Sequence, residues 1–300
     1  MNIRHRHIDP TDLLLGQIAA AISLTANAPI TRLKLVLQTQ DENIRAGRLE
    51  HRYKGIVHCV KEIVRTEGVY HFWRGNLAKI LDYVPGHVAN FYLRDIFKKM
   101  NPYTIRDGTF IFLTANVLVG ACAGGTAALI SVPFDYARVR LAADVLKTNE
   151  SQRQFAGLVD VWKRTIQKDG FFSMYRGLVS TVAGIIVYRG SYFGLYDTFV
   201  HIIKSDDLTT KFAIGYCTTL TAGSLAYPFD TIRKRMMMTC LEENRYATSL
   251  HCAKHILVHD GIRGFFHGFF VQTFASVTGA ILLTGYDALR KKMEATVNKA

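Results

Sequence analysis

A proline motif occurs three times in this chain, at intervals of about a hundred residues. Each copy has a proline, a short polar residue two positions later and a cation five positions later. The copies are Pro29-Ile30-Thr31-Arg32-Leu33-Lys34, Pro133-Phe134-Asp135-Tyr136-Ala137-Arg138 and Pro228-Phe229-Asp230-Thr231-Ile232-Arg233. A proline removes a backbone donor and kinks a helix, which a membrane-spanning helix tolerates when other groups satisfy the freed carbonyl. Because each copy lies in a long apolar segment, the motif predicts three kinked transmembrane helices.

Other landmarks recur in register with the prolines. Each unit has an acid–glycine pair, then an aromatic–basic–glycine element, then an acid near the end of its second apolar segment. In the three units these are Glu67-Gly68, Trp73-Arg74-Gly75 and Asp95; Asp169-Gly170, Tyr175-Arg176-Gly177 and Asp197; and Asp260-Gly261, Phe266-His267-Gly268 and Asp287. A fixed internal period of this kind indicates one structural unit used three times. We therefore divide the chain into repeats at residues 1–105, 106–206 and 207–300.

The composition favours a membrane protein over a soluble enzyme. Hydrophobic residues make up 49% of the chain, yet its mean hydropathy is only +0.10 and its formal charge is +13. This combination suits spans with a polar inner face and basic ends. We predict an all-α membrane protein with six tilted transmembrane helices and a short surface helix in each repeat. The predicted spans are residues 12–38, 76–100, 109–142, 178–203, 211–239 and 272–293, and the first surface helix is residues 56–65.

No nucleophile, phosphate loop or metal cluster rises above background, so we predict neither an enzyme nor a resident metal. His251, His255 and His259, with Cys252, fall one turn apart and are able either to ligate a metal or to form a polar helix face. We favour the polar face, because no second group of ligands appears. The five cysteines show no CxxC spacing and suggest no disulfide framework.

With these motifs the chain resembles the mitochondrial carrier family along its whole length. The resemblance is strongest to the ADP/ATP carriers, since Arg-Lys-Arg-Met-Met-Met at residues 233–238 resembles their signature RRRMMM with one arginine changed to lysine. Residues 29–38, 72–78, 133–142 and 184–197 are also similar. The resemblance implies six helices around a threefold pseudo-axis and a central site reached alternately from either side. It further implies ADP:ATP antiport and a multi-pass location in the mitochondrial inner membrane.

The resemblance also implies a gate of ion pairs between repeats at each end of the bundle. The expected pairs are Asp135–Arg233 and Asp230–Lys34 at the matrix end, and Asp197–Arg290 and Asp287–Lys98 at the cytoplasmic end. Thr31 offers Arg138 only a hydroxyl, and Asp95 faces the uncharged Val200. Both incomplete pairs lie between repeats one and two. Weakening both gates would keep the two closed states balanced, but a loss of transport would leave the same pattern.

The positions that bind substrate in ADP/ATP carriers have changed. Leu24, Asp82 and Ala275 stand where the family has cations, and Asp82 would repel a phosphate. The remaining candidate substrate-binding residues are Lys79, Asn90, Gly184, Ile185, Tyr188, Arg189 and Arg235. Lys79 either neutralises Asp82 or reaches into the cavity, and we favour neutralisation because an intramembrane charge usually finds a partner. Tyr188 either stacks on a substrate or fills space between helices.

The aromatic–basic–glycine elements resemble the family's cardiolipin-binding positions, where helix N-termini and backbone amides hold lipid phosphate. The candidate lipid-binding residues are Gly55, Trp73, Arg74, Gly75, Gly157, Tyr175, Arg176 and Gly177. Apart from bound cardiolipin, we expect no cofactor.

Two functions remain open. The first is an ADP/ATP-type antiporter with an altered substrate preference, for which the signature motif and most gate pairs argue. The second is a transport-inactive pseudo-carrier that serves as a structural subunit of a larger inner-membrane complex, for which the lost cations argue. The expected partners are ADP and ATP if the chain transports, anionic phospholipid in either case, and a protein complex for the second function. No nucleic acid is expected.

Overall fold

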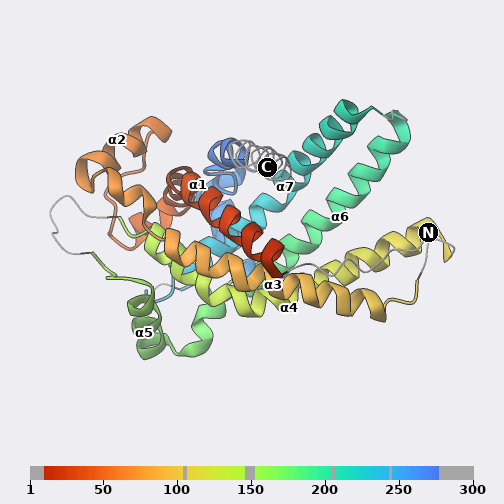
Figure 1. Ribbon diagram of the computed structural model, residues 1–300. Coiled ribbons are helices and arrows are strands. Elements are labelled where there is room, and N and C mark those ends of the chain that lie inside the picture. Colours follow the sequence, from red (N-terminus) through yellow and green to blue (C-terminus); the bar gives the residue numbers. More distant parts are fainter. Residues whose placement is uncertain (1–9, 104–106, 146–152, 204–206, 243–244, 277–300) are drawn as a thin grey trace, which may run out of the picture.

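The computed structural model describes residues 10–103, 107–145, 153–203, 207–242 and 245–276, and these residues form helices and loops without a β-strand (Figure 1). The first unit contains α1 (Pro10–Arg45), α2 (Ile56–Thr66), the 3₁₀ helix η1 (Val69–Trp73) and α3 (Asn76–Met100). The second contains α4 (Thr109–Ala142), α5 (Leu158–Asp169), η3 (Phe171–Tyr175) and α6 (Leu178–Ile203). The third contains α7 (Leu208–Met238), α8 (Ser249–His259) and α9 (Gly261–Gly264), and residues 269–276 are again helical. The prediction of an all-α fold is confirmed.

The long helices follow the order expected for spans. The bounds of α3, α4 and α6 coincide with the predicted spans, whereas most of the sixth span lies outside the described residues. The helices α1, α4 and α7 continue through Pro29, Pro133 and Pro228. The residue ranges chosen for the three repeats stay predictions.

The first helix is longer than expected. The first span was predicted to end at residue 38, but α1 continues to Arg45, so that bound is wrong. The reason is tertiary: Asp41, Glu42 and Asn43 are buried, and their side chains bond partners in other repeats. Those contacts hold as a helix a segment whose composition alone suggests a loop.

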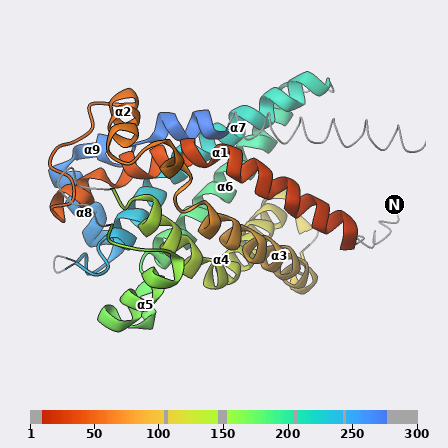
Figure 2. The ribbon, with the colours of Figure 1, turned by 60° about the vertical axis from the view of Figure 1, so that its left-hand side comes forward.

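Neighbouring repeats pack through adjacent long helices. In both views α3 lies beside α4 and α6 beside α7, while α1 closes the bundle against α7 (Figures 1 and 2). The buried core concentrates at what we call the motif end, formed by residues 29–45, 133–145 and 228–242. Outside this core many large apolar side chains of the long helices are exposed, among them Leu77, Leu118 and Val179, as expected of surfaces that face lipid.

Two helical stretches in the described chain are long and apolar enough by themselves to cross a membrane, Thr114–Ala142 and Phe171–Ile203. The helices α1, α3 and α7 fall short of that criterion. They carry charged groups toward the centre and the motif end of the bundle, such as Lys34, Asp82 and Arg233, which lowers their mean hydropathy.

A glycine fixes the position of each second helix against the next repeat. Gly75, Gly177 and Gly268 have φ angles of 83°, 90° and 79°, in the region that favours glycine. A Cβ added at these glycines would lie 3.2, 3.0 and 3.0 Å from a main-chain oxygen of the next repeat. These oxygens belong to Arg138, Arg233 and Lys34, the last residues of the three proline motifs. The aromatic–basic–glycine elements therefore position the motifs.

Candidate functional site

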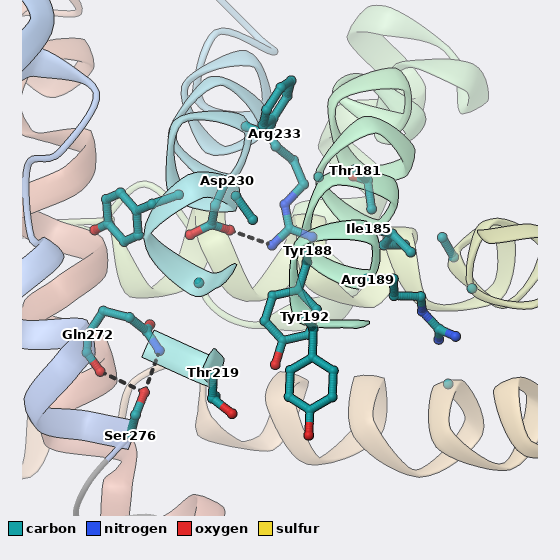
Figure 3. A pocket seen from close by; sticks show the side chains of 18 of the residues that line it. Thr181, Ile185, Tyr188, Arg189, Tyr192, Thr219, Asp230, Arg233, Gln272 and Ser276 are labelled. Carbon is teal, nitrogen blue, oxygen red and sulfur yellow. Dashed lines mark hydrogen bonds and ion pairs between the residues drawn. The ribbon is translucent and has the colours of Figure 1, made fainter. Parts of the chain in front are cut away.

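A cavity of about 1140 Å³ lies between the long helices (Figure 3). Residues from all three repeats line it, drawn from α1, α3, α4, α6, α7 and the helical residues 269–276. Its lining mixes charged, hydroxyl and aromatic groups, which is the surface expected around a polar solute rather than around lipid tails.

Ion pairs between repeats lie at the motif end of the cavity. Lys34 Nζ lies 2.9 Å from Asp230 Oδ2, and Arg233 Nη2 lies 3.2 Å from Asp135 Oδ2. These are the two matrix-end pairs named from the sequence, and Lys34, Asp230 and Arg233 also line the cavity. The structure thus places the pairs where a gate would be, and their gating role stays a prediction.

The third matrix-end position behaves differently. Arg138 donates to Asp135 within its own helix at 3.1 Å, and Thr31 Oγ1 donates to Asn27 O at 2.8 Å. Both groups therefore bond within their own helix. We call the contact surface between two repeats a seam. The seam between repeats one and two lacks the ion pair found at this position in the other two seams.

Each gate carboxylate also has a cation on its own helix. Asp230 Oδ2 accepts from Lys234 at 2.7 Å in addition to Lys34, and Asp135 accepts from Arg138 as well as pairing with Arg233. Such double pairing matters, because breaking a buried ion pair is strongly unfavourable when one charge is left alone.

The wall formed by α3 carries an ion pair of its own. Lys79 Nζ lies 2.9 Å from Asp82 Oδ2, and both residues line the cavity. The neutralisation that we favoured from the sequence is therefore present. Asn90 lies farther along the same wall, as does His87, whose ring is 3.9 Å from that of Tyr83 between centroids. Tyr83 and His87 were missed from the sequence, although they follow Lys79 at four and eight residues, a spacing that places all three on one face of a helix.

The wall formed by α6 is aromatic. Gly184, Ile185, Tyr188 and Arg189, four of the candidate substrate-binding residues, all line the cavity, and their binding role stays a prediction. Tyr188 stacks on Tyr192 with ring centroids 6.2 Å apart, and Tyr192 stacks on Tyr196 at 5.9 Å (Figure 3). The side chain of Tyr188 is 37% exposed, so its ring is accessible to a ligand as well as packed against its neighbour.

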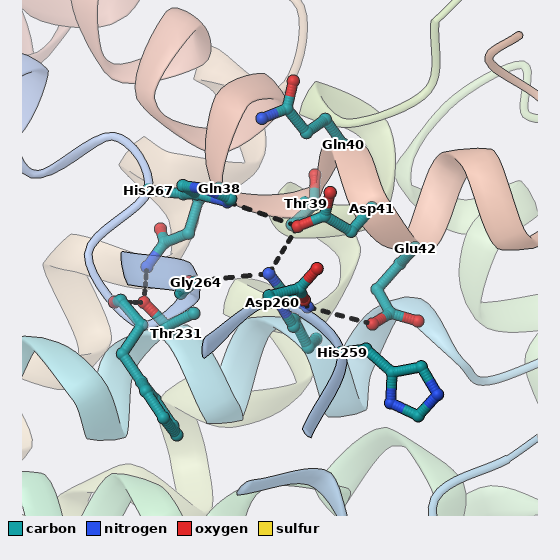
Figure 4. A network of polar contacts seen from close by, with 12 residues as sticks. Gln38, Thr39, Gln40, Asp41, Glu42, Thr231, His259, Asp260, Gly264 and His267 are labelled. Atoms are coloured by element: carbon teal, nitrogen blue, oxygen red, sulfur yellow. Dashed lines mark hydrogen bonds and ion pairs between the residues drawn. The ribbon is translucent and has the colours of Figure 1, made fainter. Parts of the chain in front are cut away.

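Arg235 corrects one prediction. It does not line the cavity but is fully buried at the motif end, where it bonds Asp260 and Asp41 at 2.6 Å each. Figure 4 shows this network between α1 and the third repeat. The reason is helical phase, since Arg235 lies two residues beyond Arg233 and so points to the opposite side of α7. A direct contact of Arg235 with a solute in the cavity is therefore wrong for this structure.

The three positions that have lost a cation differ in their surroundings. Asp82 is in the cavity wall, whereas Leu24 and Ala275 are half-buried and outside the lining. At the other end of the bundle, Asp95, Lys98 and Asp197 are exposed near the ends of α3 and α6. Their expected partners Asp287 and Arg290 lie outside the described residues.

The basic residue of each aromatic–basic–glycine element reaches the next repeat. Arg74 bonds Asp144 Oδ2 at 2.6 Å, Arg176 donates to Tyr246 O, and His267 Nδ1 lies 3.2 Å from Asp41 Oδ2. The contacts run from repeat one to two, from two to three and from three to one. Sequence reasoning missed these partners because they lie in neighbouring repeats. The shared register of the three elements was the available signal.

A second cross-repeat contact involves the first acid–glycine pair. Glu67 accepts from Arg32 at 2.6 Å and from Arg153 of the second repeat at 3.1 Å. Burial alone would raise the pKa of Glu67, but these guanidinium groups hold it below its ordinary value of 4.5. The group is therefore a charged link across the seam that lacks a gate pair.

The histidines of α8 form an aromatic face. His255 stacks on His259 with centroids 4.0 Å apart, and the ring of Tyr246 packs against both His251 and His255. Within the described ranges, no group of three or more His, Cys, Asp or Glu side chains is placed to hold a metal ion.

Comparison with known proteins adds independent evidence. The family described as mitochondrial carrier protein matches residues 9–103, 111–207 and 204–296, which is nearly the whole chain in three successive segments. The chain is 45% identical over 285 residues to the ADP,ATP carrier protein of Neurospora crassa, covering 93% of this chain and 91% of that protein. It is 44% identical over 288 residues to the ADP,ATP carrier protein of Schizosaccharomyces pombe, covering 94% and 89%. With ADP,ATP carrier protein 1 of Saccharomyces cerevisiae it shares 42% identity over 285 residues, covering 93% and 92%.

Proposed function

This chain belongs to the mitochondrial carrier family, and from that premise we propose that it exchanges adenine nucleotides by alternating access, as an altered ADP/ATP-type antiporter. Membership makes it a multi-pass protein of the mitochondrial inner membrane and not an enzyme. The motif end is then the matrix end. The finer statement, that adenine nucleotides are the solutes, is the proposal.

The observation that carries the proposal is a cavity with ion pairs between repeats at one end. A carrier needs a central site and a barrier that breaks reversibly, and the cavity ends at Lys34–Asp230 and Arg233–Asp135. Its α6 wall presents Gly184, Ile185 and Tyr188, three of the positions that resemble the nucleotide site of ADP/ATP carriers. These features support a transport site for an aromatic anion.

The double pairing at the gate suggests how it opens. When the repeats separate, Asp230 keeps Lys234 and Asp135 keeps Arg138, because these partners are on the same helix. Neither Asp230 nor Asp135 is then left without a cation during the change, so the barrier is lower than it would be for isolated pairs. The seam between repeats one and two has no gate pair to break.

The test is uptake of labelled ADP by the purified full-length protein in ATP-loaded, cardiolipin-containing liposomes. Saturable uptake that depends on internal nucleotide and is blocked by carboxyatractyloside supports antiport. A protein that melts cooperatively in detergent, yet takes up no adenine nucleotide above empty liposomes, contradicts it.

One observation favours the second function. Asp82 puts a carboxylate into the wall where ADP/ATP carriers have a cation, and Leu24 and Ala275 replace two more cations. A pseudo-carrier needs the fold and the seams but not a phosphate site. Absence of exchange, together with co-purification of this chain in a defined inner-membrane complex after mild solubilisation, would support that function.

We also propose that anionic phospholipid binds at the predicted lipid positions through backbone amides. Gly55, Gly75 and Gly157 directly precede α2, α3 and α5, where helix N–H groups lack intrahelical partners. The guanidinium groups of Arg74 and Arg176 are already bonded to the next repeat, so they are less suited to hold a phosphate. A rise in melting temperature on adding cardiolipin, retained in an Arg74→Lys variant, would support this arrangement.

A further inference from the structure

Arg189 differs from the other cations of the cavity. Four cations line the described part of the cavity, and the other three are each bonded to a carboxylate, as Lys79 is to Asp82. No described carboxylate lies within ion-pair distance of Arg189. Its electrostatic surroundings include instead a second cation, Arg94 of α3. A guanidinium in such a place, inside a cavity, is available to an anion from outside the protein.

Two glycines of α4 fix where this guanidinium lies. A Cβ at Gly120 would lie 2.3 Å from Arg189 Nη1, and one at Gly124 would lie 3.7 Å from Nη2. The side chain therefore lies in a notch that exists because these positions have no side chain. Figure 3 shows Arg189 directed away from Tyr188 and Tyr192. The notch restricts the rotamers of Arg189, so less entropy is lost when the group binds a ligand.

The charge of the lining limits the charge of the solute. Its described residues include the four cations and two carboxylates, Asp82 and Asp230. The lining thus has two more cations than carboxylates among its described residues. One phosphate monoester carries a charge of about −1.5 to −2 at neutral pH, which balances that excess. ADP and ATP add further negative groups, and Asp82 replaces a cation that would have met them.

The aromatic wall supplies the other half of a binding site. Tyr188 is the residue next to Arg189 on α6, and its ring is exposed in the cavity beside that of Tyr192. Neighbouring residues of a helix differ by about 1.5 Å along its axis and by about 100° around it, so a ligand that contacts both groups must extend from the ring of Tyr188 to the notch that holds Arg189. A small ligand with a planar base and one anionic group matches that pair.

We propose that Arg189, held in the Gly120–Gly124 notch, binds the anionic group of the solute, and that the preferred solute is a nucleoside monophosphate rather than a di- or triphosphate. This inference rests on the proposed function, because it assumes that the cavity transports an adenine nucleotide. It assigns the anion to α6, whereas the altered family positions are Leu24, Asp82 and Ala275.

The experiment measures exchange of labelled AMP, ADP and ATP by full-length protein in cardiolipin-containing liposomes loaded with the same nucleotide. We expect AMP to have the lowest KM. Arg189→Gln should raise the KM for AMP by about tenfold to a hundredfold, the range for losing a hydrogen bond to a charged group. Arg189→Lys should restore only part of the affinity, since lysine lacks the planar fork that fills the notch.

Glycine variants test the notch without changing charge. Gly120→Ala should raise the KM for AMP, because the new methyl group occupies the position of the guanidinium. The matched control is Gly125→Ala on the same helix, whose Cβ would meet Val182 Cγ2 at an ordinary 3.7 Å and which does not line the cavity. Its KM should stay at the unmodified value. Melting temperatures of all variants identify any that fail to fold.

The outcomes separate the two claims. Exchange of ADP and ATP in preference to AMP, or an unchanged KM in a folded Arg189→Gln protein, overturns this inference and leaves the proposed antiport intact. No exchange of any adenine nucleotide by a folded protein overturns the proposed function, and this inference fails with it.

Discussion

Asp82 is the side chain through which the cavity differs most in charge from a site for a polyphosphate. It neutralises Lys79 across 2.9 Å, so two charged groups contribute little net attraction to an anion. Asp82→Asn should release Lys79 and lower the KM for ADP, by about tenfold for one restored cation in a partly screened cavity. Uptake kinetics in liposomes check this. Asp160→Asn, which removes a half-buried carboxylate on α5 that does not line the cavity, is the matched control and should leave the KM unchanged.

Gly177 tests the contact that positions the proline motif. Its φ angle is 90°, and a Cβ would lie 3.0 Å from Arg233 O. Gly170 has a similar φ angle of 82° but nothing within 4 Å, so Gly170→Ala measures backbone strain alone. That strain should reduce the free energy of unfolding by about 1–3 kcal/mol. Gly177→Ala should be destabilised by about 1–3 kcal/mol more, because its methyl group overpacks the seam. Equal melting temperatures of the two variants would show that Gly177 does not crowd the motif.

Glu67, at the C-terminus of α2, links two repeats and so makes the seam sensitive to acid. Because its pKa in the folded protein is below the ordinary 4.5, Glu67 stabilises the fold at pH values above 4.5. That stabilisation is lost as the pH falls through the lowered pKa. Melting temperature should therefore drop between about pH 5 and the lowered pKa, and Glu67→Gln should drop less over that range. Glu62→Gln, on the same helix and without the Arg32 and Arg153 contacts, should follow the unmodified protein.

The helices also show what sequence patterns predict and what they leave open. The bounds of α3, α4 and α6 followed from apolar runs and landmark residues, because those features are local. The end of α1 did not, since Asp41 is kept in a helix by Arg235 of another repeat. Arg235 was misplaced for a related reason: its motif suggested function, whereas its helical phase directs it away from the cavity. Local sequence patterns do not reveal which residues of two repeats contact each other, even where a repeated motif marks one of the two partners.

The three seams between repeats differ in the contacts that they make at the proposed gate. Two seams carry an ion pair, Lys34–Asp230 and Arg233–Asp135, while at the third Thr31 and Arg138 each bond within their own helix. The third seam is instead joined, farther from the cavity, by the ion pairs Arg74–Asp144 and Arg153–Glu67. At the motif end this seam therefore lacks an ion pair between Thr31 and Arg138 beside the cavity but has ion pairs between repeats farther from it. If the proposed gate opens, we expect the contacts of this seam near the cavity to change while those farther away persist.

A third gate pair should change the balance between the two closed states. Thr31 occupies the motif position of Asp135 and Asp230, so Thr31→Asp places a carboxylate opposite Arg138 by the threefold register. The new pair stabilises the matrix-closed state and not the opposite one. We therefore expect a higher melting temperature and an exchange rate reduced about fivefold to tenfold, since 1–1.4 kcal/mol of extra stability in one state raises the barrier by that amount. Thr31→Asn has nearly the same shape without the charge and should leave the rate close to that of the unmodified protein. Faster exchange by Thr31→Asp than by Thr31→Asn would contradict this prediction. It would mean that opening of this seam does not limit transport, because an added ion pair slows only a step in which that pair must break.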